Sequence, residues 1–572
     1  MKKIFFAFIS VALFLASCSK VDLYVEQNPY RKIVEYLPST FTMEAPGTIT
    51  PDADYSWISA SQSGNSITFT TRRNTTGVIR EACFSIAGKS QKLYVWQRAH
   101  GLDVKLTAEI IEQSATSADM KCKISSECQD DYSQEWGYVL SKTDKYADGK
   151  EYPQSSKRVF GDNKFSVSGL EIGVDYYVWV YAVSTEGDKV YSNMVALLPP
   201  VTVKAGDDLQ AKINEAKPYQ TIYVQGGVTF KSPKGGFKLG GANANKSISG
   251  GWNADFTVQS WDNLTVIDGG KDRGFYCADG DQTPMNGYCE ISYFEIINCA
   301  GEHGSAIFAC GGPVTVSNCY CHDNEAVKGT IGTNEEGASA DLTVVNCIVC
   351  NNTAAGHGAA FGFGDGKSDA EPTHAKVIGC LVYDNVSTKK DGYCSVFICY
   401  NCTELVLINN TIVSNYNWAE KKGPWGGITL RGGVSAFFAN NIFAGNFTSP
   451  TTDEMIEPEY QRQDGFLDLS SSTSVLANNI IEGSLRGGQN WTLKDNVDFA
   501  LGADLSAIMT SAYKPVGKAV GAGTLGTFSF KGGGIAPGTC DIKALLEKYS
   551  TDIAGRPRVV NGKVDIGCYS AQ

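Results

Sequence analysis

The sequence predicts an all-β protein in which two small β-sandwiches precede a long parallel β-helix. Glycine accounts for 61 of the 572 residues and aromatic residues for 11%, a composition that suits turns and pleated sheets. Short alternating stretches separated by turn residues fill the chain before Pro200. A motif then recurs about every 30 residues through the rest of the chain, which indicates stacked repeats.

The first residues are typical of an export signal. Two lysines precede the apolar run Ile4–Leu15, which is too short to span a membrane. The run leads into Leu15-Ala16-Ser17-Cys18, which resembles the lipobox of bacterial lipoproteins. This resemblance implies that residues 1–17 are removed, that Cys18 is lipidated and that residues 18–34 form a tether. We therefore expect an outer-membrane, surface-exposed lipoprotein that contacts the membrane through its lipid anchor.

Residues 35–99 are predicted to form the first β-sandwich, because strand-like stretches alternate with turn residues. The order of Trp57, Arg80 ahead of a strand, and a terminal Val95-Trp96-Gln97 resembles the BACON domain of Bacteroidetes surface proteins. The family name implies an association with carbohydrate. We favour the simpler interpretation that this domain is a spacer between the membrane and the following domains.

Residues 101–199 are predicted to form the second β-sandwich. Leu170 and Tyr176, followed by the apolar stretch Val178–Ala182, resemble a fibronectin type III domain, in which such a pair forms the tyrosine corner. Ile172 stands where that family usually has proline. The sequence assigns no chemistry to this domain.

Residues 200–572 contain the repeat that defines the largest domain. A repeat of about 30 residues must stack on its neighbours, and its alternating strands without a helical period predict a parallel β-helix with coils about 4.8 Å apart. The repeats resemble those of right-handed β-helix surface proteins, including polymorphic outer-membrane-protein repeats. The second position of the aligned segments is occupied by Asn298, Asn318, Asn346, Gly379, Asn409, Asn440 and Asn478.

Both ends of this region support the prediction. An amphipathic helix is expected to begin after Asp207, as its N-cap, and to cover the open end of the first coil. Near the other end, Asp552–Arg558 and Asp565–Tyr569 resemble the terminal motif of anchored bacterial β-helix proteins.

Lipidation of Cys18 would leave 17 of the 18 cysteines. Because this number is odd, at least one cysteine is unpaired or bonded between chains. Four of them share one repeat position, and we interpret this column as buried thiols that fill the core. Cys347 and Cys350 have zinc-like spacing, but strand alternation places them on opposite faces, so we expect no metal there. The column comprises Cys299, Cys319, Cys347 and Cys380.

A candidate ligand-binding row follows from the same register. His303, Lys328 and His357 each precede the start of a glycine-type strand, so they fall in one column with Gly392 and Trp425 further along. We expect an exposed ridge that suits an acidic polysaccharide. Unrelated loop residues near a turn are the alternative interpretation. The aromatic residues offered for stacking on sugar rings are Tyr416, Trp418 and Trp425.

Two enzyme classes are alternatives to simple binding. Gly356-His357-Gly358 matches a signature of polygalacturonases, but the paired carboxylates that this hydrolysis needs are absent from the preceding coils. A polysaccharide lyase needs a base and a cation that neutralises the uronate carboxylate. Lys328 or His357 would be the base. The neutralising group would be His303, Arg431 or a calcium ion at Asp365 and Asp369.

The net charge of −12 argues against nucleic acid as a partner, because phosphate binding needs clustered positive charge. The sequence therefore leads to the hypothesis of a cell-surface lipoprotein whose β-helix binds a glycan or an adhesion partner. A polysaccharide lyase that acts on uronic-acid-containing glycans by β-elimination is the alternative hypothesis.

Overall fold

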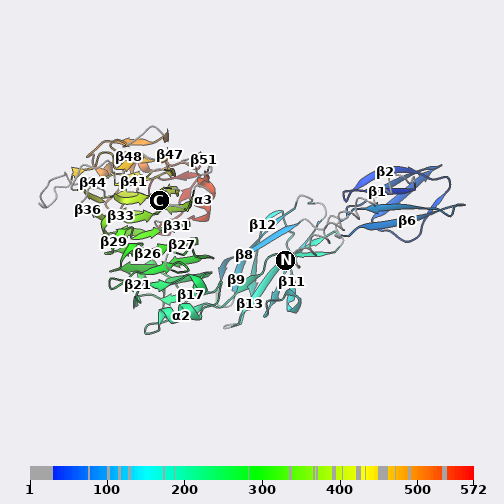
Figure 1. Cartoon of the computed structure of the whole chain (residues 1–572), viewed down its shortest axis with the longest axis horizontal. Coiled ribbons are helices and arrows are strands. Elements are labelled where there is room, and N and C mark those ends of the chain that lie inside the picture. Colours follow the sequence, from blue (N-terminus) through cyan, green and yellow to red (C-terminus); the bar gives the residue numbers. More distant parts are fainter. Residues whose placement is uncertain are drawn as a thin grey trace, which may run out of the picture. The chain divides into compact units, whose positions relative to one another are not determined.

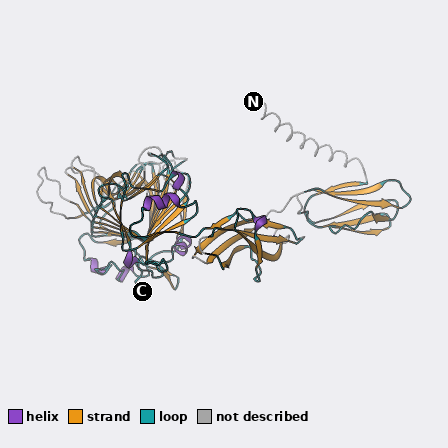
Figure 2. Cartoon of the chain, turned by 90° about the horizontal axis from the view of Figure 1, so that it is seen from below, coloured by secondary structure: helices purple, strands orange, loops and turns teal. Residues whose placement is uncertain are grey.

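The chain is built almost entirely from β-strands (Figures 1 and 2). It divides into two compact units, Met1–Pro199 and Pro200–Gln572. The computed structural model describes residues 30–571 except 75–77, 99–103, 114–116, 127–128, 130–131, 172–173, 186, 281–282, 334–337, 365–366, 369–370, 390–394, 402, 420–426, 432, 449–460, 470–471, 487–490 and 531–537. Cys18 and the expected signal and tether up to residue 29 lie outside the described residues.

The first sandwich packs two sheets around Ile67, Phe69, Leu93 and Val95, and all their strand pairs are antiparallel except β1 with β7. Alternation explains the fold, since every second residue of the strand Ser66–Thr71 is buried. One sheet has the order β1 (Arg31–Val34), β7 (Lys92–Gln97), β6 (Arg80–Ile86) and β3 (Ile49–Pro51). The other has the order β2 (Ser39–Glu44), β5 (Ser66–Thr71) and β4 (Ile58–Ser63).

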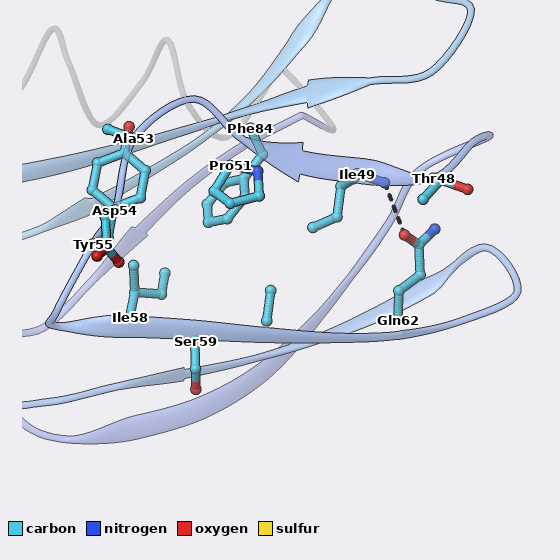
Figure 3. Close-up of a pocket in the computed structure, with 11 residues that line it drawn as sticks. Thr48, Ile49, Pro51, Ala53, Asp54, Tyr55, Ile58, Ser59, Gln62 and Phe84 are labelled. Carbon is cyan, nitrogen blue, oxygen red and sulfur yellow. Dashed lines mark hydrogen bonds between the residues drawn. The ribbon is translucent and has the colours of Figure 1, made fainter.

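A cleft of about 570 Å³ opens in this sandwich beside the edge strands β3 and β4 (Figure 3). Ile49, Ile58 and Phe84 line it with apolar surface. At one end Gln62 joins the two sheets, because its Oε1 accepts from the backbone N of Ile49 at 2.9 Å and its Nε2 donates to the carbonyl of Gly47 at 2.9 Å.

The second sandwich has a core of aromatic and aliphatic side chains that includes Trp136, Tyr138, Phe165 and Val180. Its larger sheet has the order β11 (Lys150–Pro153), β10 (Tyr132–Ser141), β13 (Tyr176–Ser184) and β14 (Lys189–Tyr191), with β15 (Val195–Leu197) also paired to β13. The smaller sheet has the order β12 (Gly161–Ser168), β9 (Ser117–Ser125) and β8 (Lys105–Gln113). The 3-10 helix η2 (Tyr146–Asp148) lies between β10 and β11.

The second unit is a right-handed parallel β-helix, so the predicted fold class is confirmed. Successive coils pair in register and form long parallel sheets along the axis. The first sheet runs through β16 (Val201–Val203), β17 (Thr221–Gln225), β20 (Lys246–Trp252), β23 (Cys289–Ser292), β27 (Gly311–Ser317), β31 (Ala340–Val345), β34 (Thr373–Ile378), β38 (Thr403–Ile408), β42 (Val434–Ala439), β47 (Ser472–Ala477) and β49 (Trp491–Lys494). The second runs through β18 (Thr229–Lys231), β21 (Thr265–Asp268), β24 (Phe294–Ile297), β28 (Tyr320–His322), β32 (Ile348–Cys350), β35 (Leu381–Tyr383), β39 (Thr411–Val413), β43 (Ile442–Phe443), β48 (Ile480–Glu482) and β50 (Val497–Phe499).

The third sheet is branched, because its long strand β33 pairs with two strands of the coil on either side. One branch contains β25 (Ala300–His303), β29 (Glu325–Lys328), β36 (Val386–Lys389), β40 (Tyr416–Ala419), β44 (Phe447–Thr448) and β45 (Gln461–Arg462). The other contains β19 (Phe237–Lys238), β22 (Phe275–Cys277), β26 (Ile307–Ala309), β30 (Ile331–Thr333), β37 (Ser395–Cys399), β41 (Ile428–Leu430) and β46 (Leu467–Asp468). Both branches meet at β33 (Thr353–Phe363).

The asparagine of the repeat occupies the corner between the first two sheets, where the backbone is left-handed. Asn318, Asn346 and Asn409 have φ of 51°, 53° and 54°, and Gly379 has φ of 63°. Asparagine and glycine tolerate this conformation better than other residues. The repeated Asn therefore marks a turn that each coil must make.

Inward-facing columns follow this corner. The predicted thiol column Cys299, Cys319, Cys347 and Cys380 is fully buried, and Asn410 continues it. A second column contains Asn324, Asn352, Asn385, Asn415 and Asn446, and each side-chain amide donates to the Oδ1 of the next at 2.9–3.0 Å. These buried amides satisfy one another along the axis.

Helix α2 (Leu209–Glu215) packs Leu209 and Ile213 onto the first coil. Its N-cap is Asp208, whose side chain accepts from the backbone N of Ala211 at 2.9 Å, so the expectation of Asp207 was one residue early. Asp207 instead accepts from the backbone N of Lys204 at 2.7 Å, in the preceding turn.

The C-terminal segment packs against the outer faces of the later coils. Helix α3 (Ile542–Lys548) buries Ile542 and Leu546 against outward-facing residues such as Val406 and Phe437 of the first sheet. The terminal motif fixes the rest of the segment, because the Arg558 guanidinium donates to the Oδ1 of corner residue Asn346. Its short strands are β51 (Thr527–Phe530), β52 (Gly538–Asp541), β53 (Val559–Val560) and β54 (Lys563–Val564). Within the described ranges, no helix has the length and apolarity needed to cross a membrane.

A candidate basic strip on the β-helix

Four cationic or titratable side chains lie on successive coils at the third side of the β-helix, and we call them the basic strip: Arg273, His303, Lys328 and His357. Backbone pairing places His303 opposite Lys328 and Lys328 opposite His357. The predicted register of these three residues is therefore confirmed. Neighbouring coils in a parallel sheet are about 4.8 Å apart, so the strip repeats at that interval along the axis.

A glycine corner directly follows three members of the basic strip. Gly304, Gly329 and Gly358 have φ of 55°, 83° and 72°, a backbone conformation that residues with a side chain rarely adopt. Space is short as well, because a Cβ on Gly304 would lie 2.4 Å from the carbonyl oxygen of Ile307. The sharp turn at each glycine fixes where the preceding side chain leaves the strand, which explains why these side chains stack in a column.

The two histidines are more deeply placed than the sequence suggested. His303 is 6% exposed and His357 is 9% exposed, whereas Lys328 and Arg273 are half-buried. The expectation of an exposed ridge is therefore wrong for the histidines, whose side chains are almost completely covered by the surrounding protein. Arg273 and Lys328 are the members that present charge to solvent.

Burial lowers the pKa of His303 to about 4, and the positive charges of Lys328 and Arg273 act in the same direction. Glu302 opposes them, with its Oε1 4.0 Å from the Nε2 of His303. His303 is consequently neutral at pH 7. It cannot act as the cation that neutralises a uronate carboxylate, which corrects one of the roles considered for it.

Arg273 was missed by the sequence analysis and is held firmly in the strip. Its Nε donates to the carbonyl oxygen of His303 at 3.1 Å. Its guanidinium lies 5.3 Å from the ring centroid of Phe308 and 5.6 Å from that of Tyr276. A sequence signal was available, because Arg273-Gly274 repeats the cation-glycine pair of His303, Lys328 and His357.

A cation and aromatic side chains flank the basic strip on the neighbouring branch. Lys238, Tyr276 and Phe308 occupy one register position on β19, β22 and β26. The Nζ of Lys238 lies 3.6 Å from the centroid of the Tyr276 ring. The positive charge of this region therefore extends from Lys238 to Lys328 over successive coils.

The remaining predicted site residues do not all join the strip. Arg431 lies just after β41, exposed and 5.4 Å from the Tyr400 ring centroid, about two coil spacings or roughly 10 Å along the axis from His357. Tyr416 begins β40 and stacks on Phe447 with centroids 5.1 Å apart, and burial raises its pKa. Trp425, Gly392, Asp365 and Asp369 lie outside the described residues, as does the side chain of Trp418.

The possible metal ligands are likewise separated. Cys347 is buried in the inward column, whereas Cys350 faces the other way and its Sγ lies 3.7 Å from the Oη of Tyr320. Among the residues that the structure describes, no three His, Cys, Asp or Glu side chains are grouped so as to hold a metal ion.

No protein-family model and no curated protein sequence matches this chain. Among solved structures it is similar to pectate lyase Pel3 from Pectobacterium carotovorum, with 12% identity over 70% of this chain and 92% of that one and a TM-score of 0.13. It is also similar to a Family 28 exopolygalacturonase from Yersinia enterocolitica, with 9% identity over 69% and 98% of the two chains and a TM-score of 0.19. The I9–I11 tandem from titin matches with 12% identity over 31% and 69%, at a TM-score of 0.18. These identities and TM-scores are too low to assign an activity to this chain.

Proposed function

We propose that the β-helix binds an acidic polysaccharide along the basic strip. The observation that supports this most strongly is the placement of Arg273, His303, Lys328 and His357 on successive coils of a chain whose net charge is −12. Arg273 and Lys328 concentrate two positive charges on an otherwise acidic protein, and such a local concentration attracts anions. The charges of Arg273 and Lys328 lie two coil spacings apart, about 10 Å, a distance comparable with two sugar rings of a polysaccharide.

The chemistry of the strip favours carboxylates as the recognised groups. The guanidinium of Arg273 can bind a carboxylate in a bidentate manner, and Lys328 supplies a second cation nearby. The backbone contact to His303 holds the guanidinium in place, so less rotamer entropy is lost on binding. Neutral His303 adds a polar group without adding charge.

The two N-terminal sandwiches then serve to present this site. In this proposal the chain is a bacterial lipoprotein, lipidated at Cys18 and displayed on the outer membrane. A BACON-like domain and a fibronectin type III-like domain separate the β-helix from the membrane. The tether and sandwiches would raise the strip above the cell surface, where polysaccharide is encountered.

A lyase acting on the same polysaccharide is the second candidate, and the register of Lys328 with both histidines favours it. Unprotonated Lys328 would remove the proton α to the uronate carboxylate, and Arg273 would neutralise that carboxylate. As the carbon–carbon double bond forms, the glycosidic C–O bond at the β carbon would break, and the leaving oxygen would take a proton from water. The two functions differ in outcome, because only the lyase releases an unsaturated uronate that absorbs in the ultraviolet.

The decisive experiment compares polygalacturonate with its methyl-esterified form on the full-length chain and on two variants, Arg273→Gln and Lys328→Gln. Each variant should bind polygalacturonate about tenfold more weakly, because one charged hydrogen-bonding group is lost from a half-buried position. The methyl-esterified polymer, which lacks the charge, should bind poorly to the unmodified chain. Affinity should fall as salt is added.

Lys271→Gln is the matched control. Lys271 lies two residues from Arg273 in the same turn, is exposed, and pairs with Glu325 at 2.6 Å outside the strip. Equal binding of both polymers, or equal affinity of all three variants, would contradict the proposal. Release of unsaturated product that disappears in Lys328→Gln would establish the lyase, and an adhesion partner becomes the better hypothesis if no acidic polysaccharide binds.

A further inference from the structure

The outer face of the larger sheet in the second sandwich carries a cluster of aromatic side chains, which we call the aromatic face: Tyr146, Trp179, Tyr181 and Tyr191. Antiparallel sheets with one face in the core usually present polar residues on the other. Here Val139, Trp179, Tyr181 and Val183 form an apolar cluster separate from the core of the domain. Together with Tyr146 and Tyr191, which reach the surface above it, this cluster forms a candidate binding site.

The rings of the aromatic face are ordered by the backbone beneath and beside them. Tyr181 and Gly137 are cross-strand partners, and a Cβ on Gly137 would lie 2.5 Å from the Tyr181 Oη, so the glycine makes room for the ring. The short helix η2 brings Tyr146 over the sheet. Its ring stacks on Tyr191 with centroids 4.7 Å apart and planes at 25°, and it meets Trp179 edge-on at 6.3 Å.

The accessible part of the aromatic face is Tyr146, which is 51% exposed, together with half-buried Tyr191. Trp179 and Tyr181 lie below as supports, at 7% and 3% exposure. Burial raises the pKa of Tyr191 further above its ordinary value, and its protonated hydroxyl can donate a hydrogen bond. Rings held in this way lose little freedom when a ligand stacks on them.

The rim of the aromatic face carries an ion pair and the further carboxylate of Glu135, so it has no excess of positive charge. Lys189 Nζ contacts both oxygens of Glu151, at 2.7 and 2.6 Å, and lies 4.7 Å from the Tyr181 ring centroid. The pair supplies both donors and acceptors with no net charge. This composition fits a neutral partner rather than a polyanion, and the polar ring edges fit hydroxyl groups better than an acyl chain.

We propose that the aromatic face binds a neutral oligosaccharide, with a pyranose ring stacked on the face of Tyr146 that Tyr191 does not cover and its hydroxyl groups bonded to Lys189 and Glu151. This site is independent of the basic strip and of the polysaccharide proposed for it. It would make the second sandwich a glycan-binding domain, although the sequence assigned it no chemistry.

The experiment titrates the full-length chain with four neutral probes, each used alone: cellohexaose, xylohexaose, mannohexaose and maltohexaose. At least one should bind and change the tryptophan emission, because Trp179 lies beside Tyr146. Tyr146→Ala should weaken that binding by roughly three- to tenfold, the contribution of one stacked ring, and Tyr191→Ala should weaken it as well because the Tyr146 ring loses its support. Tyr146→Phe keeps the ring and should retain most of the affinity.

Met194→Ala is the matched control, because Met194 is exposed in the same domain but is not part of the aromatic face. Near-ultraviolet circular dichroism establishes that each variant is folded. The proposal is overturned if none of the four probes binds, or if the Tyr146→Ala/Tyr191→Ala double variant binds as tightly as Met194→Ala. It is equally overturned if Arg273→Gln/Lys328→Gln removes the binding of the neutral probe, since the ligand would then occupy the basic strip.

Discussion

The asparagine column inside the β-helix should be the main polar determinant of coil stability, and Asn385 at its centre is the residue to change. Its Nδ2 donates to the carbonyls of Val349 and Tyr383 at 2.8 and 3.0 Å and to the Oδ1 of Asn415 at 2.9 Å. Its Oδ1 accepts from the backbone N and the Nδ2 of Asn352 at 3.2 and 2.9 Å. Asn385→Ala removes all of these contacts at a site with no exposure.

The expected cost follows from this hydrogen bonding. A buried hydrogen bond contributes about 1 kcal/mol net, and a buried donor left without its acceptor costs about 1–3 kcal/mol. Two donors on one amide nitrogen share three acceptors, so the contacts are not fully additive. We therefore expect a loss of about 3–4 kcal/mol in the free energy of opening these coils.

Alkylation of the neighbouring buried cysteines measures that opening. Cys347 is fully buried and burial raises its pKa, so the folded protein should react only when the coils open. If reclosing is fast, the labelling rate follows the free energy of opening. Asn385→Ala should then accelerate native-state labelling of Cys319, Cys347 and Cys380 roughly a hundred- to a thousandfold, read by mass spectrometry.

Ser387→Ala is the control on the adjacent strand. Ser387 is equally buried but makes a single hydrogen bond, from its Oγ to the carbonyl of Gly356 at 2.9 Å, so its loss should accelerate labelling only about fivefold. Equal acceleration by the two variants would refute the reasoning. Rapid labelling of the unmodified protein would refute the assigned burial of the thiols.

Three further predictions follow from single residues. Cys18→Ala should move the protein out of the detergent phase in a partition assay, because the proposed lipid anchor is lost, and retention there would contradict the anchor. Cys347→Asp should lower the free energy of unfolding by several kcal/mol, because it buries a charge, and the midpoint of thermal unfolding should fall accordingly. An unchanged midpoint would show that this side chain does not face the core. The pKa of His303 is about 4 in the folded chain against about 6.5 unfolded, so its contribution is complete above pH 6.5 and falls by up to about 3 kcal/mol as the pH drops towards 4. The unfolding midpoint of His303→Gln should consequently depend less on pH in that window, and parallel profiles would disprove the assignment.

The register of the β-helix could be predicted from the sequence because stacked repeats bring equivalent positions together. The thiols of Cys319, Cys347 and Cys380 share one repeat position, and the structure buries all of them. The same reasoning placed His303, Lys328 and His357 side by side. In both cases each residue lies beside the residue at the equivalent position of the next coil, so aligning two neighbouring repeats is sufficient to predict the contact.

The tertiary structure decided how exposed those side chains are and which other residues they contact. The side chains of His303 and His357 are almost completely buried, which the repeat pattern does not reveal. The contact of the Arg273 Nε with the His303 carbonyl, which holds the guanidinium in the strip, is likewise visible only in the structure.

Longer-range contacts were equally beyond sequence reasoning. Arg558 binds Asn346 from 212 residues away, and Tyr146 reaches Tyr191 across a folded sheet. Periodicity in a sequence reports which residues recur at equivalent positions. Burial, pKa and ligand-binding surface depend instead on which distant segments pack against those positions, and that is set only when the whole chain has folded.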